Sequence, residues 1–131
     1  MGHVGRAAAR KAREDGATVY TYDIDNINDL DLNIEYLRGL ILSAYSPLQR
    51  SPIVVTEEMV KKMPFQSIIV DVSIDQGGNC ETSRVTKHSD PVFTKHGVTH
   101  YCVPNIPGRV PKRASEALSE AILAYLLTVL V

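Results

Sequence analysis

Two glycines near the start of the chain have a spacing that suits phosphate binding. Gly2 and Gly5 are separated by two residues and are followed by an alanine-rich run, so they match the second half of the pattern G-x-G-x-x-G. In that pattern the glycines let the backbone and the start of a helix approach the pyrophosphate of a dinucleotide. We therefore predict that Gly2, Val4 and Gly5 contact a pyrophosphate. The first glycine of the pattern and the strand that normally precedes it are missing.

A carboxylate follows this glycine pair at a distance that suggests a ribose ligand. Residues 17–23 are β-branched and aromatic, which favours a strand, and they end in Asp23. In dinucleotide-binding folds an acid about twenty residues after the glycine loop accepts hydrogen bonds from the ribose hydroxyls. A carboxylate there repels a 2′-phosphate, so Asp23 predicts NAD in preference to NADP. The alternative is a turn aspartate, because Asp25, Asn26 and Asn28 belong to the same loop.

Two further polar residues follow segments that are predicted to be buried strands. Residues 67–73 form the strongest strand candidate and lead into Asp75, and residues 99–103 lead into Asn105 and Ile106. Ligands of open α/β sheets bind at the carboxyl ends of the strands. We therefore predict that Asp75, Asn105 and Ile106 lie around the bound ligand.

A third strand candidate covers residues 39–44, which are apolar and end in small residues. If this strand is parallel to the others, Ser43 and Ala44 stand at the same edge of the sheet. Their backbone groups are then expected to approach the adenosine side or the pyrophosphate of the ligand. A plain strand end is the alternative interpretation of these two residues.

The elements that must position these residues alternate between helix and strand. Residues 6–15 favour a helix that Gly16 ends, Thr56 can cap a helix over 57–63, and 114–130 form a last helix that we expect to be docked. This order predicts an α/β fold of the Rossmann-like class, a doubly wound parallel sheet in three αβα layers, incomplete at its N-terminal side. We expect residues 1–131 to form a single truncated domain.

The composition excludes several other classes of function. Fourteen Lys and Arg balance fifteen Asp and Glu, so nothing indicates a nucleic-acid or anionic membrane partner. Cys80 and Cys102, in a chain without a secretory leader, predict free thiols and a cytoplasmic location. The spacing of His88, His96 and His100 does not suit a metal site, so we predict no metal.

The second half of the chain resembles the cofactor domain of bacterial alanine dehydrogenases. The motifs that carry the resemblance, in order, are VDVSIDQGG at 70–78, ETSR at 81–84, TKHSDP at 86–91, YCVPNIPG at 101–108 and SEAL at 115–118. The superfamily also contains the nicotinamide nucleotide transhydrogenase alpha subunit and opine-type dehydrogenases related to carboxyethyl-ornithine and saccharopine enzymes. The resemblance implies an NAD(H)-binding domain from an oxidoreductase that interconverts L-alanine with pyruvate and ammonia.

The resemblance also assigns roles to two residues and points to what is missing. The aspartate that matches Asp75 has a catalytic role beside the nicotinamide, and the asparagine that matches Asn105 lines the same pocket. The family's separate substrate domain is absent, residues 24–38 are shorter than in the family, and Asn79 with Cys80 replaces a cysteine and an aromatic residue. We expect that replacement to loosen packing around the nicotinamide loop.

These departures lead to three hypotheses about function. The first is a cofactor domain that binds NAD(H) but is inactive alone, forms a homo-oligomer and meets a small amino or oxo acid only beside a substrate domain. The second is the corresponding domain of a transhydrogenase or an opine-type dehydrogenase. The third is a non-catalytic remnant that associates with itself through an exposed sheet edge.

Overall fold

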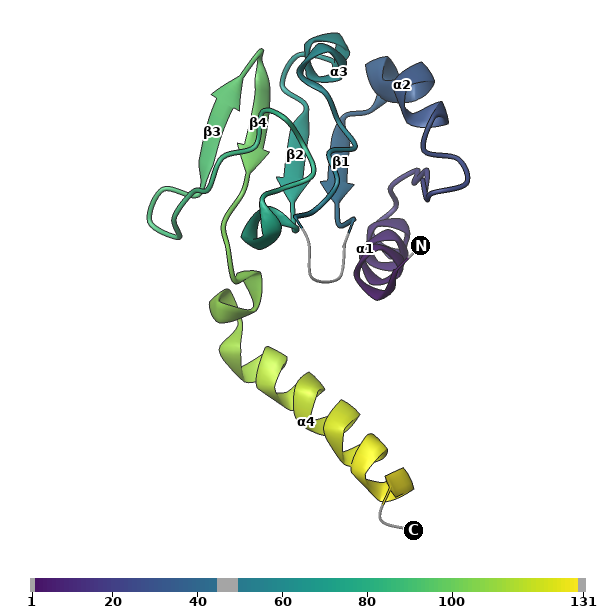
Figure 1. The fold of residues 1–131 in the computed structure, drawn as a ribbon, viewed down its shortest axis with the longest axis vertical. Helices are drawn as coiled ribbons and strands as arrows, with labels where there is room; N and C mark the ends of the chain where they lie inside the picture. Colours follow the sequence, from purple (N-terminus) through teal and green to yellow (C-terminus); the bar gives the residue numbers. More distant parts are fainter. Residues whose placement is uncertain (1, 45–49, 130–131) are drawn as a thin grey trace.

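The structure is a computed structural model that describes residues 2–44 and 50–129 (Figure 1). In chain order its elements are α1 (His3–Glu14), α2 (Asp29–Asn33), η1 (Ile34–Tyr36), β1 (Gly39–Leu42), α3 (Glu57–Lys62), β2 (Ile68–Asp71), η2 (Ile74–Gln76), β3 (Val92–Lys95), β4 (Val98–Tyr101), η3 (Ile106–Arg109) and α4 (Pro111–Val129). The last residue of the predicted C-terminal helix, Leu130, lies outside the described residues.

A four-stranded sheet forms the centre of the fold, with the strand order β1-β2-β4-β3. The strands β1, β2 and β4 run parallel, and their register places Leu40 beside Ile69 and Ile69 beside His100. Strand β3 is antiparallel to β4, so the edge of the sheet is a hairpin. The mixed α/β class and the parallel strands confirm the sequence prediction, and all three parallel strands end at the same edge.

The hairpin between β3 and β4 was not predicted. Its two turn residues, His96 and Gly97, both have positive φ, at 54° and 76°. Such a pair suits the tight turn whose twist matches that of the strands. In the sequence, the signal for this turn is the pair His96-Gly97, which stands between the β-branched and aromatic residues of 92–95 and 98–101.

One face of the sheet carries the core. Leu42, Ile69 and Val98 point toward α3, where Val60 is fully buried, and toward Ile34 of η1. Residues 24–28 form turns, and residues 29–36 are helical, in α2 and η1. Thr56 caps α3 by accepting a hydrogen bond at its Oγ1 from the Met59 N–H, at 3.3 Å, as predicted.

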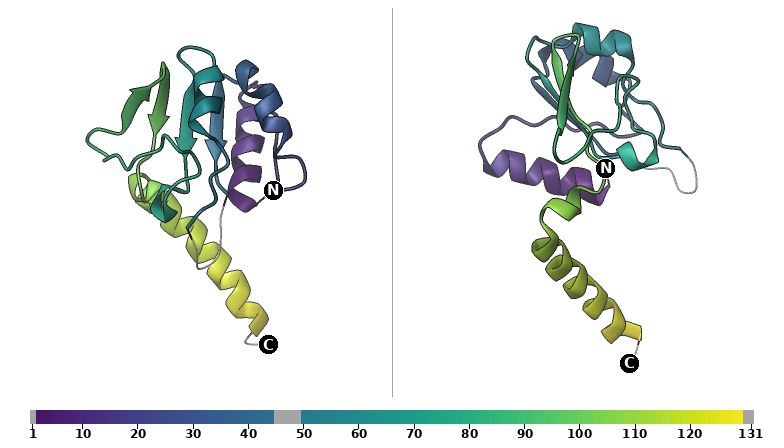
Figure 2. Two further views of the ribbon diagram at one scale, coloured as in Figure 1. Left: turned by 45° about the horizontal axis from the view of Figure 1, so that its top comes forward. Right: turned by 90° about the vertical axis from the view of Figure 1, so that its left-hand side faces the viewer.

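The other face of the sheet is covered only in part, as expected for a fold of this class that is incomplete at its N-terminal side. Figure 2 shows α1 on the side of the sheet opposite α3, beside β1. Ile41, Ile68 and Val92 on that face remain 50%, 49% and 45% exposed.

The helix α4 extends away from the body (Figure 1), and its Leu118 is 61% exposed, so the expected docking of this helix is wrong for the chain as described. No helix among the described residues has the length and hydropathy needed to span a bilayer.

Residues 17–23 are not a strand, which is a second correction. They follow α1 as extended chain without ladder hydrogen bonds, and no described strand lies beside them to pair with. Their β-branched and aromatic side chains favour a strand, but a strand is stable only when its backbone groups find partners. Local propensity was therefore insufficient for this segment. The helix before it ends as predicted, with Gly16 at a φ of 88°.

Candidate functional site

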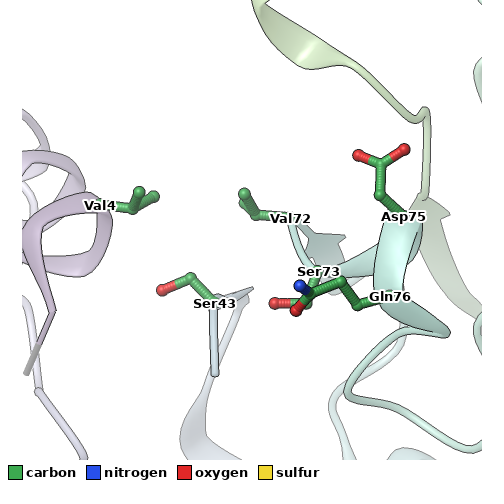
Figure 3. A pocket seen from close by; sticks show the side chains of 6 residues that line it. All are labelled: Val4, Ser43, Val72, Ser73, Asp75 and Gln76. Atoms are coloured by element: carbon green, nitrogen blue, oxygen red, sulfur yellow. The ribbon is translucent and has the colours of Figure 1, made fainter. Parts of the chain in front are cut away.

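A pocket of about 300 Å³ lies where α1 meets the carboxyl ends of β1 and β2. Its lining residues are Val4, Ser43, Val72, Ser73, Asp75 and Gln76. Figure 3 shows Val4 on α1 facing Val72 and Ser73 across the opening, with Ser43 at the end of β1. Three of the predicted site residues, Val4, Ser43 and Asp75, are thus brought together here from segments far apart in the sequence.

The start of α1 forms one wall of this pocket. Gly2 is the N-cap residue, and its carbonyl accepts the N–H of Arg6 at 3.1 Å. A Cβ added at Gly2 would have no atom within 4 Å, so this end of the helix is open. The N–H groups of a first helical turn have no partners within the helix, and with the helix dipole they favour an anion. Gly5 lies within the same helix, one residue after Val4.

Asp75 and Asn105 are joined by a direct hydrogen bond. The backbone N–H of Asn105 donates to Oδ2 of Asp75 at 3.2 Å. Asn105 has a left-handed backbone with a φ of 52°, and Ile106 follows it as the first residue of η3. Both Asp75 and Asn105 are exposed, while Ile106 is half-buried. The two residues to which the resemblance assigns the nicotinamide end therefore form one unit at the sheet edge.

Ala44 stands in the predicted place but has its backbone groups engaged. Its N–H donates to Oδ1 of Asn79 at 2.9 Å. Its carbonyl accepts from Nδ2 of Asn79 and from the hydroxyl of Ser73, both at 3.0 Å. Ala44 thus contributes to the site by fixing the chain next to Ser43.

A buried carboxylate supports the turn that carries Asn79. Asp71 is fully buried and accepts hydrogen bonds from the backbone N–H of Asn79 at 2.8 Å and from the hydroxyl of Ser83 at 2.6 Å. Gly78 has a φ of 79°, and a Cβ at this position would lie 2.8 Å from the same carboxylate oxygen. Asn79 and Cys80 are 0% and 2% exposed, so the expected loosening of this loop is wrong. The amide of Asn79 finds three hydrogen-bond partners here, which no sequence pattern revealed.

Asp23 lies in a turn outside the pocket lining. Its backbone N–H donates to Oδ1 of Asn26 at 2.6 Å, and its own Oδ1 accepts from the N–H of Ile24 at 2.9 Å. This is the arrangement of the turn aspartate that the sequence offered as the alternative. Because the segment before it is not a strand of the sheet, Asp23 does not stand at a strand end. Its role as a ribose ligand remains a prediction.

The two cysteines and His100 lie buried in the interior, and His96 forms a pair with an acidic residue nearer the surface. Cys80 and Cys102 are free and buried, and burial raises the pKa of both thiols, which keeps them protonated near neutral pH. His100 is fully buried and accepts a hydrogen bond at Nε2 from Thr82 at 2.7 Å, whereas His96 pairs with Glu57. No group of three potential metal ligands occurs among the residues that the structure describes.

Val72, Ser73 and Gln76 line the pocket but were not predicted as site residues. They follow β2 directly or belong to the short η2 helix after it. The rule that ligands lie at the carboxyl ends of parallel strands applies to them as well as to Asp75. A prediction that included the whole stretch after β2 would have found them.

Residues 26–130 match the family model described as alanine dehydrogenase/PNT, C-terminal domain. The chain belongs to this family. The matched range contains the predicted site residues from Ser43 to Ile106 and begins after Asp23.

Known proteins support the assignment in sequence and in structure. Alanine dehydrogenase 2 of Staphylococcus aureus (strain USA300) is 41% identical over 113 residues, which are 86% of this chain and 30% of the relative. A structure of L-alanine dehydrogenase superposes with a TM-score of 0.79 at 35% identity, over 95% of this chain and 40% of the other. The transhydrogenase from Sinorhizobium meliloti gives a TM-score of 0.67 at 26% identity, over 93% and 34%. The family member described here therefore spans 30% to 40% of the length of these relatives.

These matches confirm the resemblance found in the sequence motifs. They also confirm the Rossmann-like α/β class and the prediction that the chain corresponds to the NAD-binding part of such an oxidoreductase.

Proposed function

We propose that this chain is the NAD(H)-binding domain of an alanine dehydrogenase and holds the dinucleotide in the pocket between α1 and the ends of β1 and β2. The observation that carries the proposal is the convergence of Val4, Ser43 and Asp75 on that pocket. They come from the three elements that a dinucleotide site at this sheet edge requires: a helix N-terminus and two strand ends.

The residues present fit such a ligand. The open N-terminus of α1 at Gly2 and Gly5 suits the pyrophosphate, since no side chain occupies the space beside Gly2. Ser43 offers a hydroxyl on the opposite side of the opening. Asp75, Asn105 and Ile106 belong to the end assigned to the nicotinamide, and Asp23 is the ribose ligand of this proposal.

For a protein that joins this domain to a substrate domain, we propose oxidation of L-alanine with NAD⁺ and water to pyruvate, ammonium, NADH and a proton. NAD⁺, when bound, accepts the hydride. Asp75 would orient ammonia or take part in proton transfer beside the nicotinamide. Asp75 is exposed in this chain, and in this proposal a separate substrate domain covers it during the reaction. We therefore propose that residues 1–131 bind the cofactor without turning over alanine.

A titration of the chain with NADH in a calorimeter tests the proposal. Ser43→Asp places a carboxylate in the pocket, where it repels a pyrophosphate, and should weaken binding at least about tenfold. Ser89→Asp adds the same charge at an exposed residue of another loop and should leave affinity unchanged. Absence of binding to the folded wild-type chain, or equal effects of the two variants, would contradict the proposed site. NADPH should bind more weakly than NADH if Asp23 contacts the ribose.

A second candidate is the corresponding domain of a transhydrogenase, which the 0.67 TM-score over 93% of the chain favours. The two candidates predict different partners. Alanine-dependent reduction of NAD⁺ on addition of a substrate domain supports the first candidate. Hydride exchange between NADH and an NADP⁺-binding partner protein supports the second.

We also propose a cytoplasmic homo-oligomer. The free thiols of Cys80 and Cys102 support a reducing compartment. The exposed side chains of Ile41 and Ile68 on the open sheet face, and of Leu118 on α4, support association because apolar patches of this kind commonly mark interfaces. Sedimentation at several concentrations should show an oligomer, and a monomer at high concentration would refute this part of the proposal.

A further inference from the structure

Asn79 does not line the pocket, but it joins the end of β1, which does, to residues 52–55 before α3. It is fully buried. Its side chain donates to the carbonyls of Ala44 at 3.0 Å and Pro52 at 2.8 Å, and accepts from the N–H of Ala44 at 2.9 Å. Its backbone carbonyl accepts from Val54 and Val55 at 2.8 and 3.1 Å. The three hydrogen bonds of the Asn79 side chain are thus made to Ala44 and Pro52, which belong to the connection between β1 and α3.

The contact with Ala44 continues the sheet beyond its last paired residues. The ladder between β1 and β2 is followed by a hydrogen bond from the Val72 N–H to the Leu42 carbonyl, at 2.9 Å. Two residues later the amide of Asn79 bonds to both the N–H and the C=O of Ala44, as a neighbouring strand would. The chain after β1 is therefore held by hydrogen bonds up to Ala44, the residue after Ser43.

Asn79 is itself fixed from the other side. Its N–H donates to the buried carboxylate of Asp71 at the end of β2, and Ser83 donates to the same oxygen. Asp71 thus holds the turn against β2. Asn79, through its bonds to Ala44, then holds the end of β1 at a fixed position relative to β2. A shorter or apolar side chain at 79 would remove the hydrogen bonds that it makes to the half-buried Ala44 and to the carbonyl of Pro52.

We propose that Asn79 is a positioning residue for the nucleotide site: it sets the distance between Ser43, directly after β1, and the segment after β2 that carries Ser73 and Asp75. This inference rests on the proposed function, because it concerns the same pocket. Asn79 does not line the pocket, so its influence on binding passes through Ala44. Loss of its amide should let the Ser43 side move and so lower affinity for the nucleotide.

The test compares Asn79→Ala with Ser83→Ala. Both variants remove a side chain that hydrogen-bonds within the segment after β2, fully buried for Asn79 and half-buried for Ser83, but only the first removes contacts with Ala44. We expect both to lower the midpoint of urea unfolding, and only Asn79→Ala to weaken NADH binding by about tenfold under conditions where both are folded. Hydrogen exchange of the Ala44 amide should accelerate in Asn79→Ala and not in Ser83→Ala. If Asn79→Ala does not fold, Asn79→Thr retains the side-chain volume without the amide and serves the same comparison.

The outcomes separate this inference from the proposed function. Unchanged NADH affinity in a folded Asn79 variant would overturn the inference while the nucleotide site stands. Equal losses of affinity in the Asn79 and Ser83 variants would also overturn it, since they indicate general loosening. If the wild-type chain binds no NADH, the proposed function fails, and unchanged exchange at Ala44 would then remove the positioning role as well.

Discussion

The backbone N–H of Asn105 donates to Oδ2 of Asp75 at 3.2 Å, which ties the loop after β4 to the short helix after β2. The two residues stand thirty positions apart in the sequence. Asn105 holds a left-handed backbone at this point, with a φ of 52°, a conformation that asparagine adopts more readily than most residues. Asp75 therefore has a structural role that is independent of any part in catalysis.

Two substitutions at Asp75 separate these roles. Asp75→Asn retains an oxygen that can accept from the Asn105 N–H, whereas Asp75→Ala retains none. In the chain as it stands, we expect Asp75→Ala to weaken NADH binding by about threefold to tenfold and Asp75→Asn to remain close to wild type, as measured by calorimetry. When a substrate domain is supplied, both should lose turnover. Full turnover by Asp75→Asn would remove the carboxylate from the proposed chemistry.

Gly78 and Gly16 provide a matched pair for the stability of the loop below the site. Both have positive φ, at 79° and 88°, but a Cβ at Gly78 would lie 2.8 Å from the Asp71 carboxylate, and one at Gly16 would meet nothing within 4 Å. Gly16→Ala should cost about 1 kcal/mol from backbone strain alone. Gly78→Ala should cost at least about 2 kcal/mol more, because it also disturbs a buried carboxylate and its hydrogen bonds. Urea unfolding measures both, and equal losses would show that the close approach has no cost.

The elements that the sequence predicted well are those determined by local chemistry. Thr56 followed by two glutamates predicted the start of α3, and Gly16 predicted the end of α1, because caps act within a few residues. The segment 17–23 failed for the opposite reason. A strand requires a neighbour that is distant in sequence, and β propensity carries no information about whether that neighbour is present.

The sequence also predicted part of the candidate site, namely the residues that follow strand ends. Strand ends are visible in the sequence, so Ser43, Asp75 and Asn105 could be placed at one edge. The role of Asn79 could not be found in this way, since its amide bonds to Ala44 and Pro52, more than twenty-five positions earlier. An asparagine beside two glycines is also typical of a solvent-exposed turn. Burial, which decides between these interpretations, is a property of the assembled fold.

His100 provides a prediction for the pH dependence of stability. Its ring donates from Nδ1 to the carbonyl of Val98 at 3.0 Å and accepts at Nε2 from Thr82 at 2.7 Å, and it stacks on Phe93. The neutral ring satisfies both bonds, whereas a protonated Nε2 can no longer accept from Thr82. Burial lowers the pKa of His100 below its ordinary value of 6.5.

The sign of the effect follows from this lowered pKa. Below pH 6.5 the unfolded chain binds a proton at this histidine that the folded chain excludes, so the free energy of unfolding falls as the solution becomes more acidic. His100→Gln keeps an acceptor for Thr82 but does not titrate. We expect it to be less stable at pH 7 by about 1 to 3 kcal/mol and to lose less stability between pH 7 and pH 5 than the wild type. His88→Gln, at an exposed residue, should leave the wild-type slope unchanged. Urea unfolding at several pH values measures all three proteins, and a wild-type slope in His100→Gln would show that another group governs the acid response.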